Sequence, residues 1–344
     1  MTIKDCRPPQ PRPCQPDPAL AFLWACTLDV AVRKPGNVSL AAPGHDMQAE
    51  QFLASACVSA PPLFDAASAV GDRLEAAVRA TRAAAGCNTN LGILLLCAPV
   101  VRAHETLGAP PGLSPAGLQA ALGRVLAALD VADARAAYRA IAIANPGGLG
   151  TVSAQDVSAE PEVGLVAAMR LAADRDLIAR QYASGYADVF ALGLAAFAGP
   201  SCAAPGTPAE PLAQRVQRVY LAWLATHPDT HIMRKHGEAT ARAVSAEAAA
   251  WRTRLAAEPT AAAGEAFAAW DDALKARGLN PGTSADLTVC TLFIAALLEP
   301  ALASVAADET HRKVLERCLL TSRVSPCPDP SAAHAPSLPF PTPP

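Results

Sequence analysis

The stretch AAGCNTNLGILLLCAPVV, residues 84–101, decides the fold class of this chain. Its second half, Leu91–Val101, is a continuous apolar run without the polar–apolar alternation of a half-buried strand. Asn88, Thr89 and Asn90 stand directly before this run, and residues of these types cap helices. The stretch therefore predicts a buried α-helix, and because one cap would suffice, three capping residues suggest a functional role.

The rest of the chain has the composition of a helical protein. Of its 344 residues 51% are hydrophobic and 5% aromatic, and alanine, the best helix former, is abundant. Strand-like runs are nearly absent. Apolar spacings of three and four predict helices over roughly 19–32, 46–59, 66–85, 91–106, 114–128, 131–144, 162–195 (with a break), 209–226, 237–257, 261–277, 284–304 and 308–320. We predict an all-α protein, a single large multi-helix bundle.

Both ends of the chain are rich in proline. Six of the 32 prolines fall within residues 1–18 and eight within 326–344. We expect residues 1–18 and 321–344 to be disordered tails, and residues 19–320 to form one all-helical domain. The segment NPGGLG at 145–150 follows a helical pattern instead of a strand, so no dinucleotide-binding fold is predicted; it opens a polar loop through residue 161.

Charge and cysteine usage narrow the class of protein. The net charge of −3 gives no electrostatic footprint for nucleic acid or anionic lipid. The ten cysteines form no C-x-x-C pair, which is typical of reduced cytosolic thiols. No signal peptide is visible, and the apolar runs fall short of the about 20 residues of a membrane span. We expect a cytoplasmic protein with small-molecule partners; the sequence does not indicate its oligomeric state.

Polar side chains gather at the ends of the predicted helices. Asp46 and Glu50 are four residues apart, so we expect them on one face of a helix. Together with Asp229 and Asp286 they could hold Mg²⁺, which takes carboxylates, water and substrate phosphate as ligands. Each acid has an alternative role as a helix cap or a solvated side chain.

Basic side chains and helix N-termini suit phosphate. Lys34, Arg180 and Arg234 could each contact a phosphate group, and a helix N-terminus offers unpaired N–H groups. These features predict a nucleotide site. One alternative is a helical metal-dependent phosphohydrolase, because GHDM at 44–47 contains a His-Asp pair, but no histidine precedes His45. The other, a helical scaffold, leaves the polar loops unexplained.

Seven segments, taken in order and with their spacing, resemble the triphosphoribosyl-dephospho-CoA synthases, which make a prosthetic-group precursor for citrate and malonate decarboxylating systems. The resemblance covers roughly residues 20–305. The segments are KPGNVS (34–39), GHDM (44–47), GCNTNLG (86–92), NPGGLG (145–150), DRDLIARQYASGYADVF (174–190), DTHIMRKHG (229–237) and NPGTSADLTVCTLF (280–293).

The resemblance implies an all-α pentosyltransferase with ATP and dephospho-CoA as substrates. The ribose 2′-hydroxyl of 3′-dephospho-CoA would attack C1′ of the ATP ribose, adenine would leave, and the triphosphate would be retained. Such a glycosyl transfer needs a base, stabilisation of the sugar cation and a hold on the triphosphate. The catalytic candidates are Asp286 and Asp46, and the inferred Mg²⁺ ligands are Asp46, Glu50 and Asp229. The nucleotide- and phosphate-binding candidates are Lys34, Asn37, His45, Asn88, Thr89, Asn90, Arg180, Arg234 and Ser284.

Four positions depart from the family pattern. Asn90 and Leu91 stand where the family has His-Lys, Ser39 stands where it usually has an acid, and Thr283 replaces a glycine. Loss of a lysine removes a strong phosphate contact. The alternative is therefore a divergent member of the family that acts on another phosphate- or ribosyl-bearing cofactor precursor.

Overall fold

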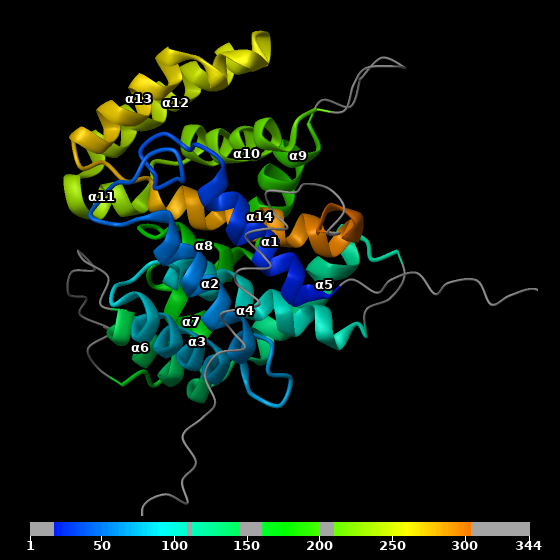
Figure 1. Cartoon of the computed structure of the whole chain (residues 1–344). Helices are drawn as coiled ribbons and strands as arrows, with labels where there is room; N and C mark the ends of the chain where they lie inside the picture. The colour runs from blue at the N-terminus through cyan, green and yellow to red at the C-terminus, as the bar shows by residue number, and fades with distance from the viewer. Residues whose placement is uncertain (1–16, 109–111, 145–159, 200–209, 304–344) are drawn as a thin grey trace, which may run out of the picture.

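The computed structural model describes residues 17–108, 112–144, 160–199 and 210–303 (Figure 1). Its elements are α1 (Pro18–Ala31), α2 (Ala49–Leu63), α3 (Val70–Ala85), α4 (Leu91–Thr106), α5 (Pro115–Ala128), α6 (Val131–Ala144), α7 (Leu165–Arg170), α8 (Leu177–Ser184), η1 (Val189–Gly193), α9 (Leu194–Ala198), α10 (Leu212–Thr226), α11 (Thr230–His236), α12 (Glu238–Ala257), η2 (Pro259–Ala263), α13 (Glu265–Ala276), α14 (Gly282–Leu298) and η3 (Pro300–Ala303). No strand occurs in these ranges, which confirms the all-α prediction. The predicted helix 308–320, the tail segments 1–16 and 321–344, and most of the polar loop 145–161 lie outside them.

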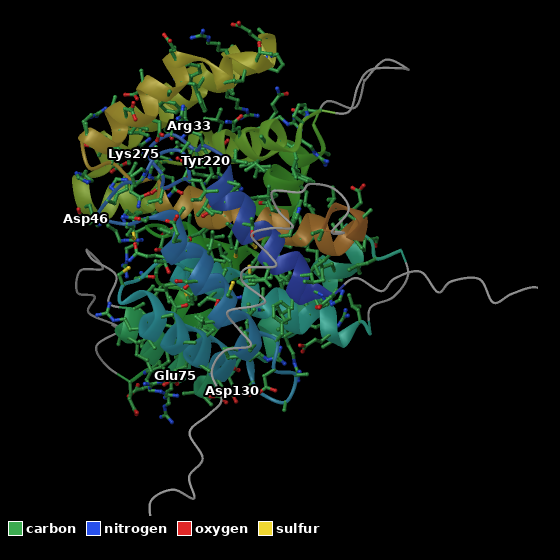
Figure 2. The ribbon with its side chains drawn as sticks, viewed as in Figure 1. Arg33, Asp46, Glu75, Asp130, Tyr220 and Lys275 are labelled. Carbon is green, nitrogen blue, oxygen red and sulfur yellow. The ribbon has the colours of Figure 1, made fainter. Side chains whose placement is uncertain are left out.

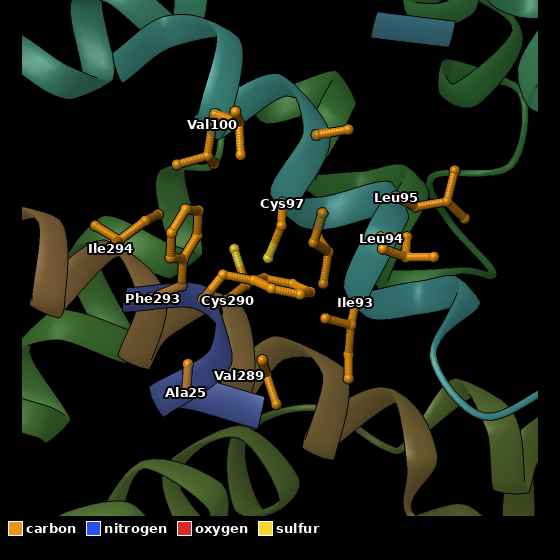
Figure 3. Close-up of a cluster of buried hydrophobic side chains, with 14 of the residues drawn as sticks. Ala25, Ile93, Leu94, Leu95, Cys97, Val100, Val289, Cys290, Phe293 and Ile294 are labelled. Atoms are coloured by element: carbon orange, nitrogen blue, oxygen red, sulfur yellow. The ribbon is translucent and has the colours of Figure 1, made fainter. Parts of the chain in front are cut away.

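Helix α14 runs through the middle of the bundle, with α1, α4 and α10 packed around it (Figure 1). Every residue of α14 from Thr283 to Leu297 is buried except Asp286, which is half-buried. Figure 3 shows Cys97 of α4 facing Cys290 of α14 inside this apolar interface. A helix that is apolar on all sides is stable only when neighbours enclose it, so α4 and α14 fix the centre of the fold.

Buried apolar side chains form two clusters. The larger surrounds α1, α4 and α14, and it contains an edge-to-face group of three rings, Phe22, Phe64 and Phe293, with centroids 6.0 to 6.3 Å apart. The smaller joins α10 to α13, where Trp251 and Trp270 stack at 5.8 Å. No helix in the described part of the chain is long and apolar enough to cross a membrane.

The segment predicted as a helix with one break, 162–195, is divided into α7, α8, η1 and α9. Asp176 begins α8 because its Oδ1 accepts hydrogen bonds from the amides of Ile178 and Ala179 at 2.9 and 3.0 Å. Gly185 ends α8 in the left-handed conformation, and Tyr186 follows it at φ 61°. Capping at both ends therefore overrides the helical periodicity that runs through the segment.

Helix α11 was not among the predicted helices, because Pro228 breaks the segment HPDTHIMRKHG. The helix begins one residue after Asp229, whose Oδ1 accepts hydrogen bonds from the amides of His231 and Ile232. The proline therefore precedes the cap and does not enter the helix. Figure 1 shows α11 beside the N-terminal end of α14 and the loop that follows α1.

Candidate functional site

The loop between α1 and α2 is fastened to the start of α14. Tyr220 Oη donates a 2.6 Å hydrogen bond to the Pro35 carbonyl, and an Asp271 carboxylate oxygen accepts one of 2.8 Å from the amide of Gly36. Gly36 has φ +82°, and a Cβ there would lie 2.8 Å from the Leu279 carbonyl oxygen. Only glycine fits this close approach, which sets the KPGN segment against the residues that precede α14.

Figure 2 shows Arg33, Tyr220 and Lys275 close together, where this loop meets α10 and α13. Lys275 Nζ donates 2.9 Å hydrogen bonds to the Ala42 carbonyl and to Asp271 Oδ2, and Arg33 Nε lies 3.6 Å from the same carboxylate oxygen. Asp271 is fully buried, so these cations offset its desolvation. The loop is therefore held by an ion-pair network of the protein itself.

Lys34 is fully buried and paired with Asp29 of α1. Its Nζ donates to the Asp29 carbonyl and lies 3.0 Å from Asp29 Oδ1. Burial raises the pKa of Asp29, and the Lys34 ammonium opposes that shift. The predicted contact between Lys34 and a phosphate stays a prediction; in this structure the ammonium neutralises a buried acid.

Asp229 joins two helix N-termini. Its Oδ1 caps α11, and its Oδ2 accepts hydrogen bonds from the Ser284 amide at 2.7 Å and the Ser284 hydroxyl at 2.8 Å. Burial raises the Asp229 pKa, and these hydrogen bonds act against the shift. Both carboxylate oxygens and the Ser284 hydroxyl are thus engaged in fastening α11 to α14, which leaves the predicted metal role of Asp229 and nucleotide role of Ser284 without support from the geometry.

Asp286 lies in the first turns of α14, and its carboxylate packs directly on α4. A Cβ on Gly92 would lie 2.1 Å from Asp286 Oδ2, so glycine is required for this approach. The carboxyl group has no hydrogen-bond partner among the described residues. Burial raises the Asp286 pKa well above its ordinary value; Asp29, Asp229 and Asp176 raise it further.

Arg234 is the cation that opposes this shift in the pKa of Asp286. Its Nη1 donates a 2.8 Å hydrogen bond to Asp176 Oδ2, while its Nε is buried without a partner. We name the group of Asp29, Asp176, Asp229, Arg234 and Asp286 the α14 site. It holds four carboxylates, one guanidinium and two unpartnered polar groups, a combination typical of a ligand site.

Arg180, the other predicted phosphate ligand of this region, pairs instead with Asp188. Its Nε donates a 3.0 Å hydrogen bond to Asp188 Oδ2, and the arginine side chain is 46% exposed. Gln181 donates to the same oxygen at 3.3 Å. The structure gives Arg180 a partner outside the α14 site, so its predicted phosphate role stays a prediction.

The three polar residues before α4 have partners inside the protein. Asn88 Oδ1 accepts a hydrogen bond of 3.2 Å from the Leu91 amide. Thr89 and Asn90 are buried, and they bond to three side chains of α2 and α3: Ser55 at 2.6 Å, Thr81 at 3.0 Å and Ser59 at 3.3 Å. These contacts explain three consecutive capping-type residues by helix packing. The nucleotide role predicted for Asn88, Thr89 and Asn90 stays a prediction.

The segment GHDM forms a tight turn in place of the predicted start of a helix. His45 and Asp46 have φ 55° and 59°, and α2 begins only at Ala49. Asp46 and Glu50 therefore do not share a helical face, and that prediction is wrong; both side chains are exposed. The predicted Mg²⁺ set of Asp46, Glu50 and Asp229 is not assembled, and no such cluster of metal ligands occurs within the described ranges.

Three charged residues of the site region were not predicted from the sequence: Asp29, Asp176 and Asp271. Asp29 had a readable signal, because it is the only acid in the apolar run that forms α1. The sequence holds no such signal for Asp176 and Asp271. Asp176 caps α8 and Asp271 lies buried in α13, and in a sequence neither differs from an exposed helical acid. His231, in the DTHIMRKHG segment, was not among the candidate site residues either, and its Nε2 is buried.

The described residues form an all-helical fold in which charged groups gather near the N-terminal end of one central helix, α14. The model of the ATP:dephospho-CoA triphosphoribosyl transferase family matches residues 16–304 of the chain. The chain therefore belongs to this family and is a pentosyltransferase that moves the triphosphoribosyl group from ATP to dephospho-CoA. This confirms the resemblance seen in the sequence.

A solved structure shows the same fold. It is a crystal structure described as a proposed triphosphoribosyl-dephospho-CoA synthase from Archaeoglobus fulgidus, similar to this chain with a TM-score of 0.56 and 22% sequence identity. The match covers 73% of this chain and 98% of that one. No curated protein sequence matches the chain.

Proposed function

We propose that the α14 site is where the family reaction takes place, with Asp286 as the general base. The ribose 2′-hydroxyl of 3′-dephospho-CoA attacks C1′ of ATP, adenine leaves, and the triphosphate stays on the transferred ribose. The observation that carries the assignment is the Asp286 carboxylate: alone in a buried helix, close against Gly92 and without a hydrogen-bond partner.

The environment of Asp286 suits proton transfer. A carboxylate of ordinary pKa is a weak base at neutral pH, and burial with three neighbouring acids raises the pKa of this one. The same acids create a negative field where positive charge develops on the sugar at C1′. A preorganised field of this kind stabilises such a transition state without reorganisation.

Arg234 is the proposed triphosphate ligand. Its guanidinium is held on one side by Asp176, and its Nε remains without a partner. Arginine offers several donors in a fixed fork, so it can keep the contact with Asp176 and bind a phosphate oxygen as well. The last turn of α11 also contains the exposed Lys235, which adds positive charge at this end of the site.

Mg²⁺ would enter as part of the substrate, bound to the triphosphate of ATP. Asp29 is a candidate contact for that ion, because carboxylate oxygen is a preferred ligand of Mg²⁺; it would share its charge with Lys34, whose Nζ lies 3.0 Å from Asp29 Oδ1. The ion would neutralise phosphate charge. We also infer a cytoplasmic location, which agrees with ATP as a substrate and with Cys87, Cys97 and Cys290 as thiols.

The direct test measures adenine release from ATP in the presence and absence of dephospho-CoA. We expect release that depends on dephospho-CoA, and a loss of at least about 100-fold in Asp286→Asn. Asp46→Asn tests the other catalytic candidate, and Asp272→Asn on the exposed side of α13 is the matched control; we expect both to retain activity. Full activity in Asp286→Asn would reject the base, and activity lost in Asp46→Asn would move the site to the GHDM turn.

A further inference from the structure

A group of uncharged polar side chains lies at the first residue of α14. Asn37 Nδ2 donates a 3.0 Å hydrogen bond to Asn280 Oδ1. A Cβ on Gly282 would lie 3.8 Å from that same Asn280 oxygen and 3.6 Å from the His231 ring. Asn280 and His231 therefore lie beside Gly282, and Asn37 joins them through its hydrogen bond to Asn280. We name Asn37, Asn280 and His231, which come from three separate segments, the amide–imidazole group.

Two atoms of this group are buried without a hydrogen-bond partner. They are Asn37 Oδ1, on a side chain that is 4% exposed, and His231 Nε2. A buried polar atom without a partner loses its hydrogen bonds to water without replacement, so such atoms are rare unless a ligand or water satisfies them. Two such atoms on side chains of one small group point to a ligand that offers hydrogen bonds.

His231 is uncharged at neutral pH. Burial lowers its pKa to about 3, and the neighbouring Lys235, Arg234, His45 and His236 act in the same direction. A neutral imidazole has one donor and one acceptor nitrogen, and an amide also has both functions. The group therefore suits a flat, uncharged partner with alternating donors and acceptors, and it is a poor site for phosphate, which prefers cations.

The position of the group relative to Asp286 narrows the partner further. Gly282 and Asp286 are four residues apart on α14, which is about one helical turn, or about 6 Å. Arg234 lies one turn beyond His231 on α11. A purine base is attached directly to C1′ of its ribose, so a base on Gly282 would place C1′ near Asp286 and leave the phosphates for Arg234.

We propose that Asn37, Asn280 and His231 bind the adenine of ATP and hold it as it departs. The inference rests on the proposed function of the α14 site. In the transfer step the bond between C1′ and N9 breaks with its electron pair going to adenine, and the bond between the acceptor oxygen and C1′ forms. The hydroxyl proton passes to Asp286 and then to the released base. A hydrogen bond donated by His231 Nε2 would stabilise charge on a ring nitrogen, and Asn37 Oδ1 would accept one from the amino group of adenine.

The test uses the full chain and two separate probes, adenine and inorganic tripolyphosphate, in calorimetric titrations without dephospho-CoA. We expect His231→Ala and Asn37→Ala to weaken adenine binding about tenfold or more, and to change tripolyphosphate binding by less than about twofold. His236→Ala is the matched control, because His236 is exposed on the same helix and its imidazole hydrogen-bonds to the Gly278 carbonyl, at 3.2 Å, outside the amide–imidazole group. It should change neither affinity.

Other outcomes overturn the assignment. If the wild type does not bind adenine, or if both variants bind it as the wild type does, the group is not a purine site. If tripolyphosphate affinity falls instead, the group holds phosphate. Asn37 also joins two loops, so Asn37→Ala could lower the melting temperature. In that case the test relies on His231→Ala. Failure of dephospho-CoA-dependent adenine release in the wild type would sink the proposed function separately, since these titrations do not depend on turnover.

Discussion

Helices α4 and α14 both follow a polar stretch of sequence, but the polar groups at their N-terminal ends differ in function. Helices α4 and α14 are both buried along their length, and each follows a polar stretch that would suit a nucleotide. Before α4, Thr89 and Asn90 are bonded to side chains of α2 and α3. In α14, the Asp286 carboxyl group has no hydrogen-bond partner among the described residues and packs on Gly92 of α4.

The difference shows what separates a structural polar cluster from a functional one. Uncharged groups that satisfy one another contribute to folding, because their hydrogen bonds replace those with water. A carboxylate that is half-buried and has no hydrogen-bond partner is costly to keep, and such costs are found mainly where chemistry requires them. We therefore assign the polar residues at the N-terminal end of α4 to stability and Asp286 near the N-terminal end of α14 to activity. Substitutions at the two places should affect these two properties separately.

We expect the largest effect at Gly92, because this residue of α4 lies against the Asp286 carboxylate of α14. In Gly92→Ala the new methyl group would overlap the Asp286 carboxylate, and we expect kcat to fall by about 100-fold because the base is displaced. Gly123→Ala in α5 is the matched control, since a Cβ there meets no atom within 4 Å. The control should match wild-type activity and gain up to about 1 kcal/mol in the free energy of unfolding. Equal activity in the two variants would contradict the packing argument.

The next largest effect should be a difference in KM for ATP between variants of two arginines, Arg234 and Arg180. Arg234→Ala removes the guanidinium with a free Nε, and we expect KM for ATP to rise about 10- to 100-fold. Arg180→Ala breaks a half-exposed pair with Asp188 and should change KM by less than about threefold. Steady-state kinetics at fixed dephospho-CoA compares them. A larger effect in Arg180→Ala would restore its predicted role in phosphate binding.

At the end of α4 the expected loss is one of stability. Asn90→Ala leaves Thr81 and Ser59 without their partner, so the free energy of unfolding should fall by about 1–3 kcal/mol. Adenine release, measured well below the melting temperature, should stay within about threefold of wild type. A large loss of activity without loss of stability would place Asn90 in the substrate site after all.

The smallest effect is a dependence of stability on pH. The folded-state pKa of Asp286 is raised, so between its ordinary value of 3.8 and the raised value the folded chain binds more protons than the unfolded chain. The stability linked to this group is therefore present at low pH and lost as pH rises through that range. Asp286→Asn should be at least as stable as wild type at pH 8, and the difference between the two should shrink toward pH 4. Thermal melts of both proteins along a pH series report it; a variant that is less stable at pH 8 would contradict the sign.

The sequence was sufficient for the fold class and for most helix positions. Apolar runs such as those of α4 and α14 admit only buried helices, and the prediction for residues 131–144 agrees with α6 at both ends. The breaks around α8 and the helix α11 were harder, because they depend on Asp176 and Asp229 as caps. A cap is recognised only once the amides that it bonds to are known.

The site was predictable in part. Asp286 could be selected because a charged residue at the start of an apolar helix stands out, and Arg234 because it is a basic residue in a polar segment; their roles in the α14 site stay predictions. The sequence did not show which polar side chains hydrogen-bond to one another and which remain without a partner. Asp229 and Asn90 looked like ligands in the sequence, yet their hydrogen bonds to Ser284 and Thr81 depend on residues 55 positions later and nine positions earlier in the chain.

The most direct test of this division compares Asp286→Asn with Asn90→Ala in one experiment that records both adenine release and melting temperature. The account predicts that Asp286→Asn loses at least about 100-fold in dephospho-CoA-dependent adenine release and melts no lower than wild type. Asn90→Ala should melt lower and remain active. If Asp286→Asn mainly unfolds the protein while Asn90→Ala abolishes release in a folded chain, the roles of the two helix ends are reversed and the account is wrong.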